Sequence, residues 1–301
     1  MPIFMRLIDN KITWAGEVNK LGFEKDDGYR IPDEYLEAGK FVILRLCHGF
    51  GDWSIISAKP RLLKKKYPNS KIYIPSEKLI SETWGDDIEG WKHWPEPAKS
   101  AELVFANNPY VDGTIDSFDG EIYHDHYRIW DKDNEDEPMV EQILRFWQLD
   151  DEDIKDVNPE LYYSEEEKEL GDKIIKEYFG DEDFGGLILS NSELAKGEFY
   201  GGKIDEKTHE VLKKYKHLKF CFYSGIDIKE TPFDYMNVVL DFKDADLSIR
   251  MQCYIREKAK INLGYQSSIY DTIASKTEII CTSYTVPGLH GENYGRRIQY
   301  V

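Results

Sequence analysis

Residues 41–54, FVILRLCHGFGDWS, join an apolar run to a glycine-containing loop and the start of a helical pattern. The run 41–47 is typical of a strand that is buried on both faces of a sheet. Residues 53–67 carry apolar side chains at helical spacing, and a second apolar run follows at 71–75. This order of strand, helix and strand indicates a βαβ unit on a parallel sheet. Shorter apolar pieces follow at 101–105 and 120–123.

The same alternation returns in the second half of the chain. Five short runs rich in Ile, Val, Leu and Phe predict strands at 186–190, 218–223, 238–242, 260–264 and 278–284. Stretches with helical spacing lie at 206–214, 247–258 and 267–276. A chain of 301 residues has the length of about two domains. We therefore expect two Rossmann-like α/β domains, 1–163 and 164–301, the first with an N-terminal extension over 1–38 that includes a hairpin turned at Asp9-Asn10.

Composition narrows the class of protein. The net charge of −18 at pH 7 argues against nucleic acid as the main partner, because phosphate backbones require a basic face. The acidic stretch 131–183 is typical of a solvated helical connector. No run is long enough to span a membrane and the first residues do not resemble a secretory signal, so we expect a cytoplasmic protein. Four scattered cysteines are expected to be core residues: Cys47, Cys221, Cys253 and Cys281.

The loop at 45–54 is the first candidate site. Gly49 and Gly51 allow close approach of another molecule to the backbone, and Asp52 follows them at the start of the helical pattern. Asp52 is a candidate for a functional carboxylate at a strand end, although the residues alone favour an N-cap role for a helix from Trp53. A dinucleotide fingerprint is disfavoured, because its third glycine is replaced by Ser54.

The segment 49–74, GFGDWSIISAKPRLLKKKYPNSKIYI, resembles the opening of the bacterial heptosyltransferase family, glycosyltransferase family nine. The turn NPYVD at 108–112 is similar to a turn of that family, and the order of strands continues the resemblance over roughly 41–284. The resemblance implies a GT-B fold, in which two Rossmann-like lobes with parallel sheets face each other across a cleft. The first lobe then holds an acceptor and the second a nucleotide-sugar donor.

The resemblance also implies roles for residues of the first lobe. Asp52 matches the proposed general base, which removes a proton from the acceptor hydroxyl as it attacks the sugar. His48 is a rival base. The expected acceptor-side residues are Gly49, Gly51, His124 and His126. Metal binding by the His124-Asp125-His126 segment, completed by Asp131 or Asp133, is a weaker alternative, because no further Cys or His lies at a suitable spacing.

In the second lobe, two segments are candidates for binding the donor diphosphate. The loop after residue 189 supplies Ser190, Ser192 and Lys196, with Lys203 as an alternative lysine. The segment GYQSSI supplies the other group: Gly264, Gln266, Ser267, Ser268 and Ile269. A helix that starts here offers backbone N–H groups to an anion. This segment departs from the family pattern, because Gln266 replaces an aspartate and Tyr270 a histidine.

Nucleoside recognition is expected from Ser224, Gly225 and Asp241, which follow the next strands. The sequence therefore predicts a glycosyltransferase that needs no metal or other cofactor, takes a nucleotide sugar as donor, and acts on a hydroxyl of a glycan or glycolipid-like acceptor. Two alternatives stay open: a catalytically silent GT-B relative that binds a nucleotide or glycan, and a GT-B sugar-nucleotide epimerase. The oligomeric state is not predicted.

Overall fold

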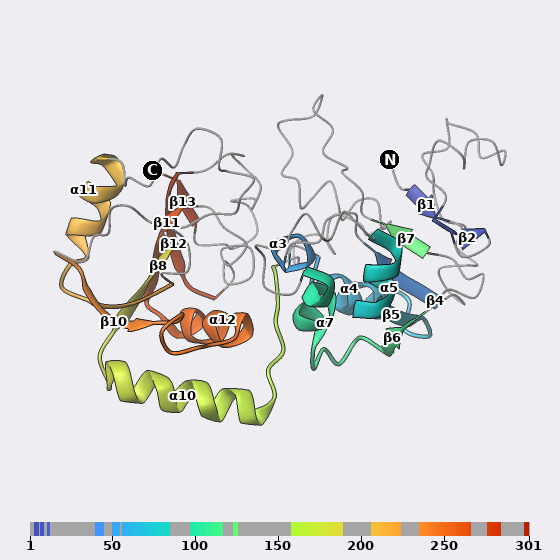
Figure 1. Cartoon of the computed structure of the whole chain (residues 1–301), viewed down its shortest axis with the longest axis horizontal. Coiled ribbons are helices and arrows are strands. Elements are labelled where there is room, and N and C mark those ends of the chain that lie inside the picture. The colour runs from blue at the N-terminus through green and yellow to red at the C-terminus, as the bar shows by residue number, and fades with distance from the viewer. Residues whose placement is uncertain are drawn as a thin grey trace. The chain divides into compact units, whose positions relative to one another are not determined.

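The structure is a computed structural model that describes residues 3–5, 7–8, 11–12, 40–44, 50–54, 56–84, 97–116, 123–125, 158–188, 206–223, 235–265, 276–283 and 298–300 (Figure 1). The chain divides into two compact units, Met1–Tyr162 and Tyr163–Val301. Each unit has its own sheet of mainly parallel strands, so the predicted α/β class is confirmed.

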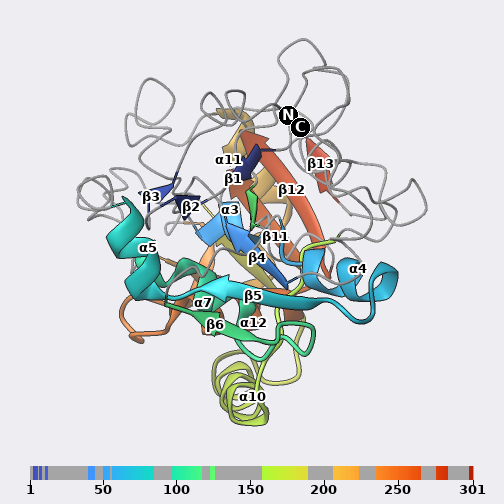
Figure 2. The ribbon, with the colours of Figure 1, turned by 90° about the vertical axis from the view of Figure 1, so that its right-hand side faces the viewer.

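The sheet of the first unit has the order β1-β7-β4-β5-β6. Its strands are β1 (Ile3–Met5), β4 (Lys40–Leu44), β5 (Lys71–Pro75), β6 (Gly113–Ile115) and β7 (Tyr123–Asp125). Strands β7, β4, β5 and β6 are parallel, and β1 joins the edge antiparallel to β7 (Figure 2). The strands expected at 41–47 and 71–75 are therefore present. The first begins one residue earlier than expected, and residues 45–47 lie outside the described residues.

The predicted N-terminal hairpin is also present. Strands β2 (Leu7–Ile8) and β3 (Lys11–Ile12) pair antiparallel, with Leu7 opposite Ile12 and Ile8 opposite Lys11. This register leaves two residues between the strands, as a tight hairpin turn requires.

The helical pattern at 53–67 forms two helices and not one. They are α3 (Phe50–Ser54) and α4 (Lys59–Lys66), separated by a turn at 56–58. The break falls before Pro60, which stands at the second position of α4 and needs no hydrogen-bond acceptor there. The other described helices of this unit are α5 (Glu77–Trp84), the 3₁₀ turn η2 (Pro97–Lys99) and α7 (Ser100–Phe105), so the apolar piece at 101–105 is helical.

The turn at 108–112 joins α7 to β6 and is fixed by its own polar side chains. The Asn108 side chain accepts a hydrogen bond from the Tyr110 N–H over 2.9 Å. Asp112 accepts from Lys64 Nζ at 2.6 Å, from Lys71 Nζ at 2.9 Å and from the Ile72 N–H at 2.8 Å. The turn therefore fastens β6 to β5 through one carboxylate.

The Asp112 carboxylate is expected to make the stability of the first unit depend on acid pH. Burial alone raises its pKa, but the hydrogen bonds from Lys64, Ile72 and Lys71 outweigh burial and lower the pKa to about 2. A carboxylate with a lowered pKa stabilises the fold above its unfolded pKa near 4 and loses that contribution as the pH falls toward 2. The contribution is about 2 kcal/mol.

Urea unfolding of the wild type and of Asp112→Asn between pH 6 and pH 2 measures this contribution. The two proteins should differ by about 2 kcal/mol at pH 6 and converge as the pH approaches 2. A difference that stays constant over this range would contradict the role assigned to the ionised carboxylate.

The sheet of the second unit is parallel throughout and has the order β10-β9-β8-β11-β12-β13. Its strands are β8 (Phe184–Ile188), β9 (Lys219–Phe222), β10 (Asn237–Asp241), β11 (Ile261–Tyr265), β12 (Glu278–Ser283) and β13 (Ile298–Tyr300). The first five confirm the predicted strands within two residues at each end. Strand β13 was not predicted.

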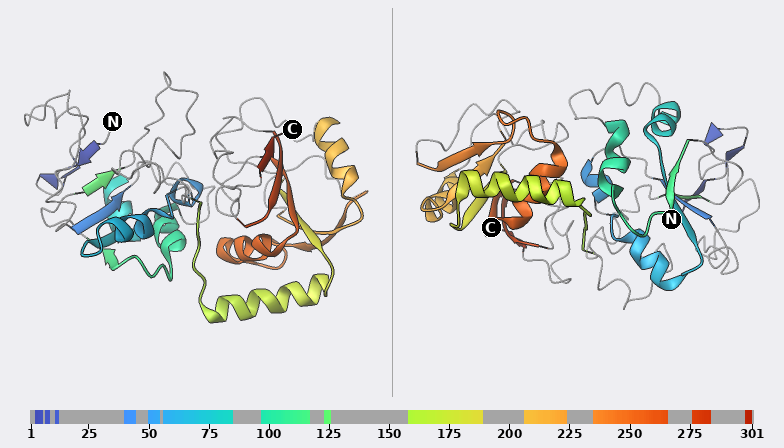
Figure 3. Two further views of the ribbon diagram at one scale, coloured as in Figure 1. Left: turned by 180° about the vertical axis from the view of Figure 1, so that it is seen from behind. Right: turned by 90° about the horizontal axis from the view of Figure 1, so that it is seen from below.

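Helices cover both faces of this sheet. Helix α11 (Glu206–Lys214) lies on one face, and α10 (Glu165–Phe179) and α12 (Ile249–Lys258) lie side by side on the other (Figures 1 and 3). Within β9, Phe220 and Phe222 pack with the α11 side chains, whereas Cys221 between them packs with the α12 side chains. Successive strand residues point to opposite faces, so both core layers are built from one continuous apolar run.

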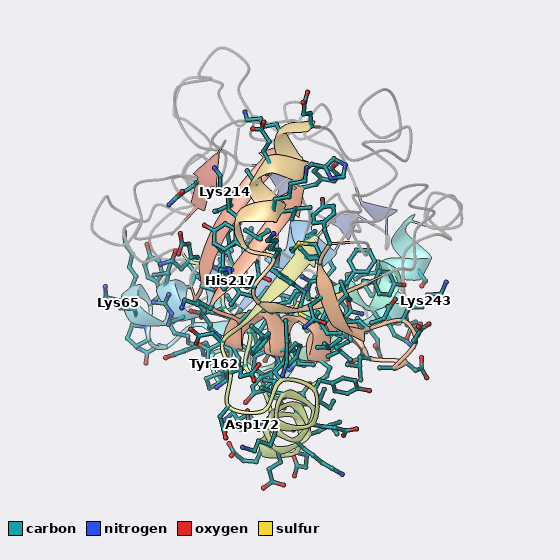
Figure 4. All side chains as sticks on the ribbon, turned by 90° about the vertical axis from the view of Figure 1, so that its left-hand side faces the viewer. Lys65, Tyr162, Asp172, Lys214, His217 and Lys243 are labelled. Carbon is teal, nitrogen blue, oxygen red and sulfur yellow. The ribbon has the colours of Figure 1, made fainter. Side chains whose placement is uncertain are left out.

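Close approach of α10 to α12 depends on a glycine. A Cβ atom at Gly171 would lie 2.2 Å from the Tyr254 ring, and the Tyr254 hydroxyl donates to Asp172 over 2.7 Å. Asp172 is labelled on α10 in Figure 4. At the start of α10, Arg250 donates twice to Glu167, over 2.6 and 2.8 Å. The rest of α10 is largely exposed, as predicted for the acidic stretch. None of the helices in the described parts of the chain has the length and apolar character to cross a membrane.

Candidate functional site

The strand order of the second unit reverses between β8 and β11. Counted along the chain, its strands have the spatial order 3-2-1-4-5-6, the doubly wound arrangement of dinucleotide-binding domains. Strands β8 and β11 are neighbours, with Leu187 opposite Leu263 and Ile188 opposite Gly264. In such sheets ligands bind beyond the carboxyl ends of the two strands at which the order reverses. The carboxyl ends of β8 and β11 therefore mark the candidate site of this unit.

The two segments that the sequence singled out for phosphate binding begin at these two strand ends. Ser190 follows the last residue of β8 by two positions, and Gln266 directly follows the last residue of β11. The topology thus brings the strand ends that precede the two segments to one edge of the sheet, although 76 positions separate Ser190 from Gln266 in the sequence. Most of these candidates lie outside the described residues: Ser190, Ser192, Lys196, Gln266, Ser267, Ser268 and Ile269.

Gly264 is the described member of the group, and its backbone geometry explains why it is glycine. Its φ angle is +133°, a region that side-chain-bearing residues rarely adopt. A Cβ atom there would lie 2.0 Å from the Ile188 carbonyl oxygen. The pairing of β11 with β12 also shifts register between Gly264 and Tyr265. Gly264 pairs with Cys281 and Tyr265 with Ser283, so the extra residue of this bulge is Thr282 of β12. Gly264 therefore allows β11 to lie close against the end of β8 beside the bulge.

The first unit has a corresponding reversal between β4 and β7. These strands are parallel neighbours, with Ile43 opposite His124 and Leu44 opposite Asp125. The predicted loop follows β4, and His124 is the middle residue of β7. The candidates of this unit thus follow β4, or belong to or follow β7, and these two strands are neighbours in the sheet. His48, Gly49 and His126 lie outside the described residues.

Asp52 lies inside helix α3, as its third residue. An N-cap precedes its helix, so the alternative role of Asp52 as the cap of a helix from Trp53 is wrong. The four other residues of α3 are buried: Phe50, Gly51, Trp53 and Ser54. The Trp53 ring packs edge-on against Phe105 at 6.3 Å, and the Ser54 hydroxyl donates to the Gly51 carbonyl over 2.8 Å. These contacts fix the backbone that carries Asp52.

Asp241 is the last residue of β10, which is the edge strand of its sheet. Its side chain accepts a hydrogen bond from the Lys243 N–H over 3.0 Å, a local turn contact. Ser224 and Gly225 lie outside the described residues, and nucleoside binding by all three stays a prediction.

The cysteines of the described residues are core residues, as predicted. Cys221, Cys253 and Cys281 are buried free thiols, and Cys47 lies outside the described residues. Burial raises the pKa of Cys221 to about 11 and that of Cys253 to about 12. Thiols held protonated in this way are poor nucleophiles and poor metal ligands. Within the described ranges, no group of three or more His, Cys, Asp or Glu side chains is arranged to hold a metal ion.

Three buried residues near the carboxyl ends of β8 and β11 were not predicted from the sequence to have a role. The Arg256 side chain donates to the Leu187 carbonyl over 2.9 Å from beneath the sheet. The hydroxyl groups of Thr208 and Thr282 bond to each other over 2.8 Å. A single arginine in a helix or threonine in a strand has no distinctive sequence signal, because only the tertiary contact gives it a role.

Two solved structures resemble this chain over most of its length. A glycosyl transferase of family 9 from Veillonella parvula DSM 2008 aligns with a TM-score of 0.52 and 11% identity, over 88% of this chain and 86% of that chain. The ADP-heptose LPS heptosyltransferase II of E. coli aligns with a TM-score of 0.50 and 12% identity, over 87% and 90%. The resemblance seen in residues 41–284 is thus confirmed for the fold. Neither a family model nor a curated protein sequence matches the chain.

Proposed function

We propose that this protein is a glycosyltransferase that moves a sugar from a nucleotide-sugar donor to a hydroxyl group of a glycan or glycolipid-like acceptor. The observation that carries the proposal is the strand order of the second unit, because the candidate phosphate segments follow the two strands at its reversal point. The fold shared with glycosyltransferases of family 9 supports it.

On the acceptor side, the proposed general base is Asp52. The acceptor hydroxyl must lose its proton as its oxygen attacks the anomeric carbon, and a carboxylate within hydrogen-bond reach accepts that proton. His48 is the alternative base. Gly49, Gly51, His124 and His126 are proposed to contact the acceptor, since they follow β4 or belong to or follow β7, the two strands at the reversal point of the first unit.

On the donor side, the reaction releases a nucleoside diphosphate that carries extra negative charge. We assign the stabilisation of that charge to Lys196, to the hydroxyl groups of Ser190, Ser192, Ser267 and Ser268, and to backbone N–H groups after Gly264. With these groups in place, transfer is proposed to need no divalent cation. Ser224, Gly225 and Asp241 are proposed to contact the nucleoside.

The test is calorimetric binding of ADP, GDP, UDP and CDP, followed by product detection with the matching sugar nucleotides and an acceptor mixture. Binding with transfer that persists in EDTA supports the full proposal. Binding without transfer supports a nucleotide-binding module, and donor conversion without an acceptor supports an epimerase. If no nucleoside diphosphate binds, the proposed donor site is wrong.

Lys196→Ala is expected to raise the Kd for the bound nucleoside diphosphate by about tenfold to a hundredfold, because one charge-assisted hydrogen bond is worth about 1.5–3 kcal/mol. Calorimetry measures the change. Lys176→Ala is the matched control, since Lys176 lies on α10, is 64% exposed and forms a surface ion pair with Asp181. Equal Kd values for the two variants would remove Lys196 from the site and direct attention to Lys203.

A further inference from the structure

Two threonine hydroxyl groups form a buried chain that ends on the carbonyl oxygen of Gly264. The Thr208 hydroxyl on α11 donates to the Thr282 hydroxyl on β12 over 2.8 Å, and Thr282 donates to the Gly264 carbonyl over 3.3 Å. Thr208 is fully buried and Thr282 is 7% exposed. Hydrogen bonds arranged in a chain polarise one another in a medium of low dielectric constant. This chain therefore ties α11 and β12 to the end of β11.

All three groups lie at the carboxyl edge of the sheet. Thr208 belongs to the first turn of α11, and Thr282 and Gly264 are each the residue before last in their strands. The hydrogen bond from Thr282 reaches the β11 backbone where its pairing with β12 shifts register. The extra residue is Thr282 itself, because Gly264 pairs with Cys281 and Tyr265 with Ser283, and a bulge increases the local twist of the two strands. The threonine pair thus acts on the backbone that leads directly into Gln266.

Packing alone does not explain the two hydroxyl groups. A valine has nearly the shape of a threonine and would fill the same space without the cost of burying a polar group. The hydroxyl groups are therefore expected to have a polar task at this edge, and the contact that the structure offers is the Gly264 carbonyl.

We propose that Thr282 and Thr208 are positioning residues that hold the carboxyl end of β11, at Gly264, in the shape needed to bind the diphosphate of a nucleotide. The proposal rests on the proposed function. Thr282 acts directly on Gly264, and Thr208 orients the Thr282 hydroxyl toward the carbonyl by donating to its oxygen. Neither residue is assigned a contact with the ligand.

The other end of β12 offers a matched comparison. Thr277 is also buried, and its hydroxyl donates to the Ala259 carbonyl over 2.8 Å. The chemistry is the same as at Thr282: a threonine hydroxyl bonds the carbonyl of the residue 18 positions earlier. Thr277 precedes β12 and so lies at the amino edge of the sheet, away from the strand ends of the candidate site.

The experiment measures the Kd of the tightest-binding nucleoside diphosphate by calorimetry and the melting temperature by circular dichroism. Thr282→Val should raise the Kd by about fivefold to tenfold, and Thr208→Val by about threefold, the effects expected from the loss of one buried hydrogen bond and of its polarisation. Thr277→Val should lower the melting temperature about as much as Thr282→Val and leave the Kd within about twofold. Thr282→Ser, which keeps the hydroxyl group, should restore the wild-type Kd.

The Kd values of these variants either support or overturn the positioning role. If Thr282→Val binds the nucleotide as tightly as Thr277→Val does, the positioning role is wrong while the proposed function stands. If the wild type binds no nucleoside diphosphate, the proposed function and the positioning role fall together. Should Thr282→Val not fold, Thr208→Val and Thr282→Ser decide: a raised Kd in the first and an unchanged Kd in the second support the role, and any other pair of results overturns it.

Discussion

Replacement of Asp52 by asparagine is expected to lower kcat for sugar transfer by about 10² to 10⁴, the range that a positioned general base contributes. Asparagine has nearly the same shape and size but cannot accept a proton at neutral pH. Because Asp52 lies on α3 in the first unit and the candidate phosphate segments belong to the second, the Kd for the nucleoside diphosphate should stay within about twofold. Steady-state kinetics and calorimetry on the same preparation measure the two effects.

Asp181→Asn is the matched control for this substitution. Asp181 is 91% exposed and pairs with Lys176 near the end of α10, so the same chemical change there should alter kcat by less than about twofold. Full activity of Asp52→Asn would show that another group removes the proton, and His48→Gln would then be the variant to measure. A loss of nucleotide binding in Asp52→Asn would instead place this carboxylate on the donor.

Gly264→Ala is expected to destabilise the second unit by at least about 3 kcal/mol. Two costs combine. An alanine at a φ angle of +133° is strained, and its Cβ atom would meet the Ile188 carbonyl oxygen at 2.0 Å. Ile188 is itself the last residue of β8, so it can withdraw only if the pairing of β8 with β11 opens. Unfolding in urea, followed by circular dichroism, measures the loss.

Gly113→Ala is the control for a glycine in a strand. Gly113 is the first residue of β6, and a Cβ atom there would meet only two carbons of the Tyr73 ring, at 3.8 Å, which is an ordinary contact. This substitution should change the free energy of unfolding by less than about 1 kcal/mol, and a stabilising effect is consistent with a smaller entropy of the unfolded chain. Equal effects of the two substitutions would contradict the close approach of β11 to β8.

The strands of the second unit were predictable because helices cover both faces of its sheet. Such strands need apolar side chains in succession, and runs such as LKFCFY at 218–223 stand out in an acidic chain. The exposed helix α11 was predictable at 206–214 for the complementary reason, since only one side of it is buried, at Thr208, Val211 and Leu212.

Short elements were harder to predict. The five residues AELVF at 101–105 form part of a helix, yet an apolar run of this length does not by itself distinguish a helix from a strand. Strands β6 and β13 have three residues each and depend on their neighbours for pairing. The sequences GTI at 113–115 and IQY at 298–300 do not predict a strand, because pairing with the partner strand supplies most of the stabilisation of so short a strand.

The candidate site, too, was predictable only in those features that a local sequence pattern determines. The sequence named both phosphate segments and Asp52, since glycine, serine, lysine and aspartate after an apolar run have a chemistry that can be recognised locally. That the carboxyl ends of β8 and β11 lie side by side was decided by the strand order, which no local pattern contains.

The sequence by itself therefore determined the α/β class, the positions of most strands, and the residue types available for chemistry, because burial and backbone preference act over a few neighbouring residues. Only the tertiary structure decided that β8 and β11 are neighbours, that Gly264 takes a positive φ angle against Ile188, and that Thr208 and Thr282 meet. The physical reason is that these contacts join residues 74 or 76 positions apart, and their stability comes from the packing of the whole sheet.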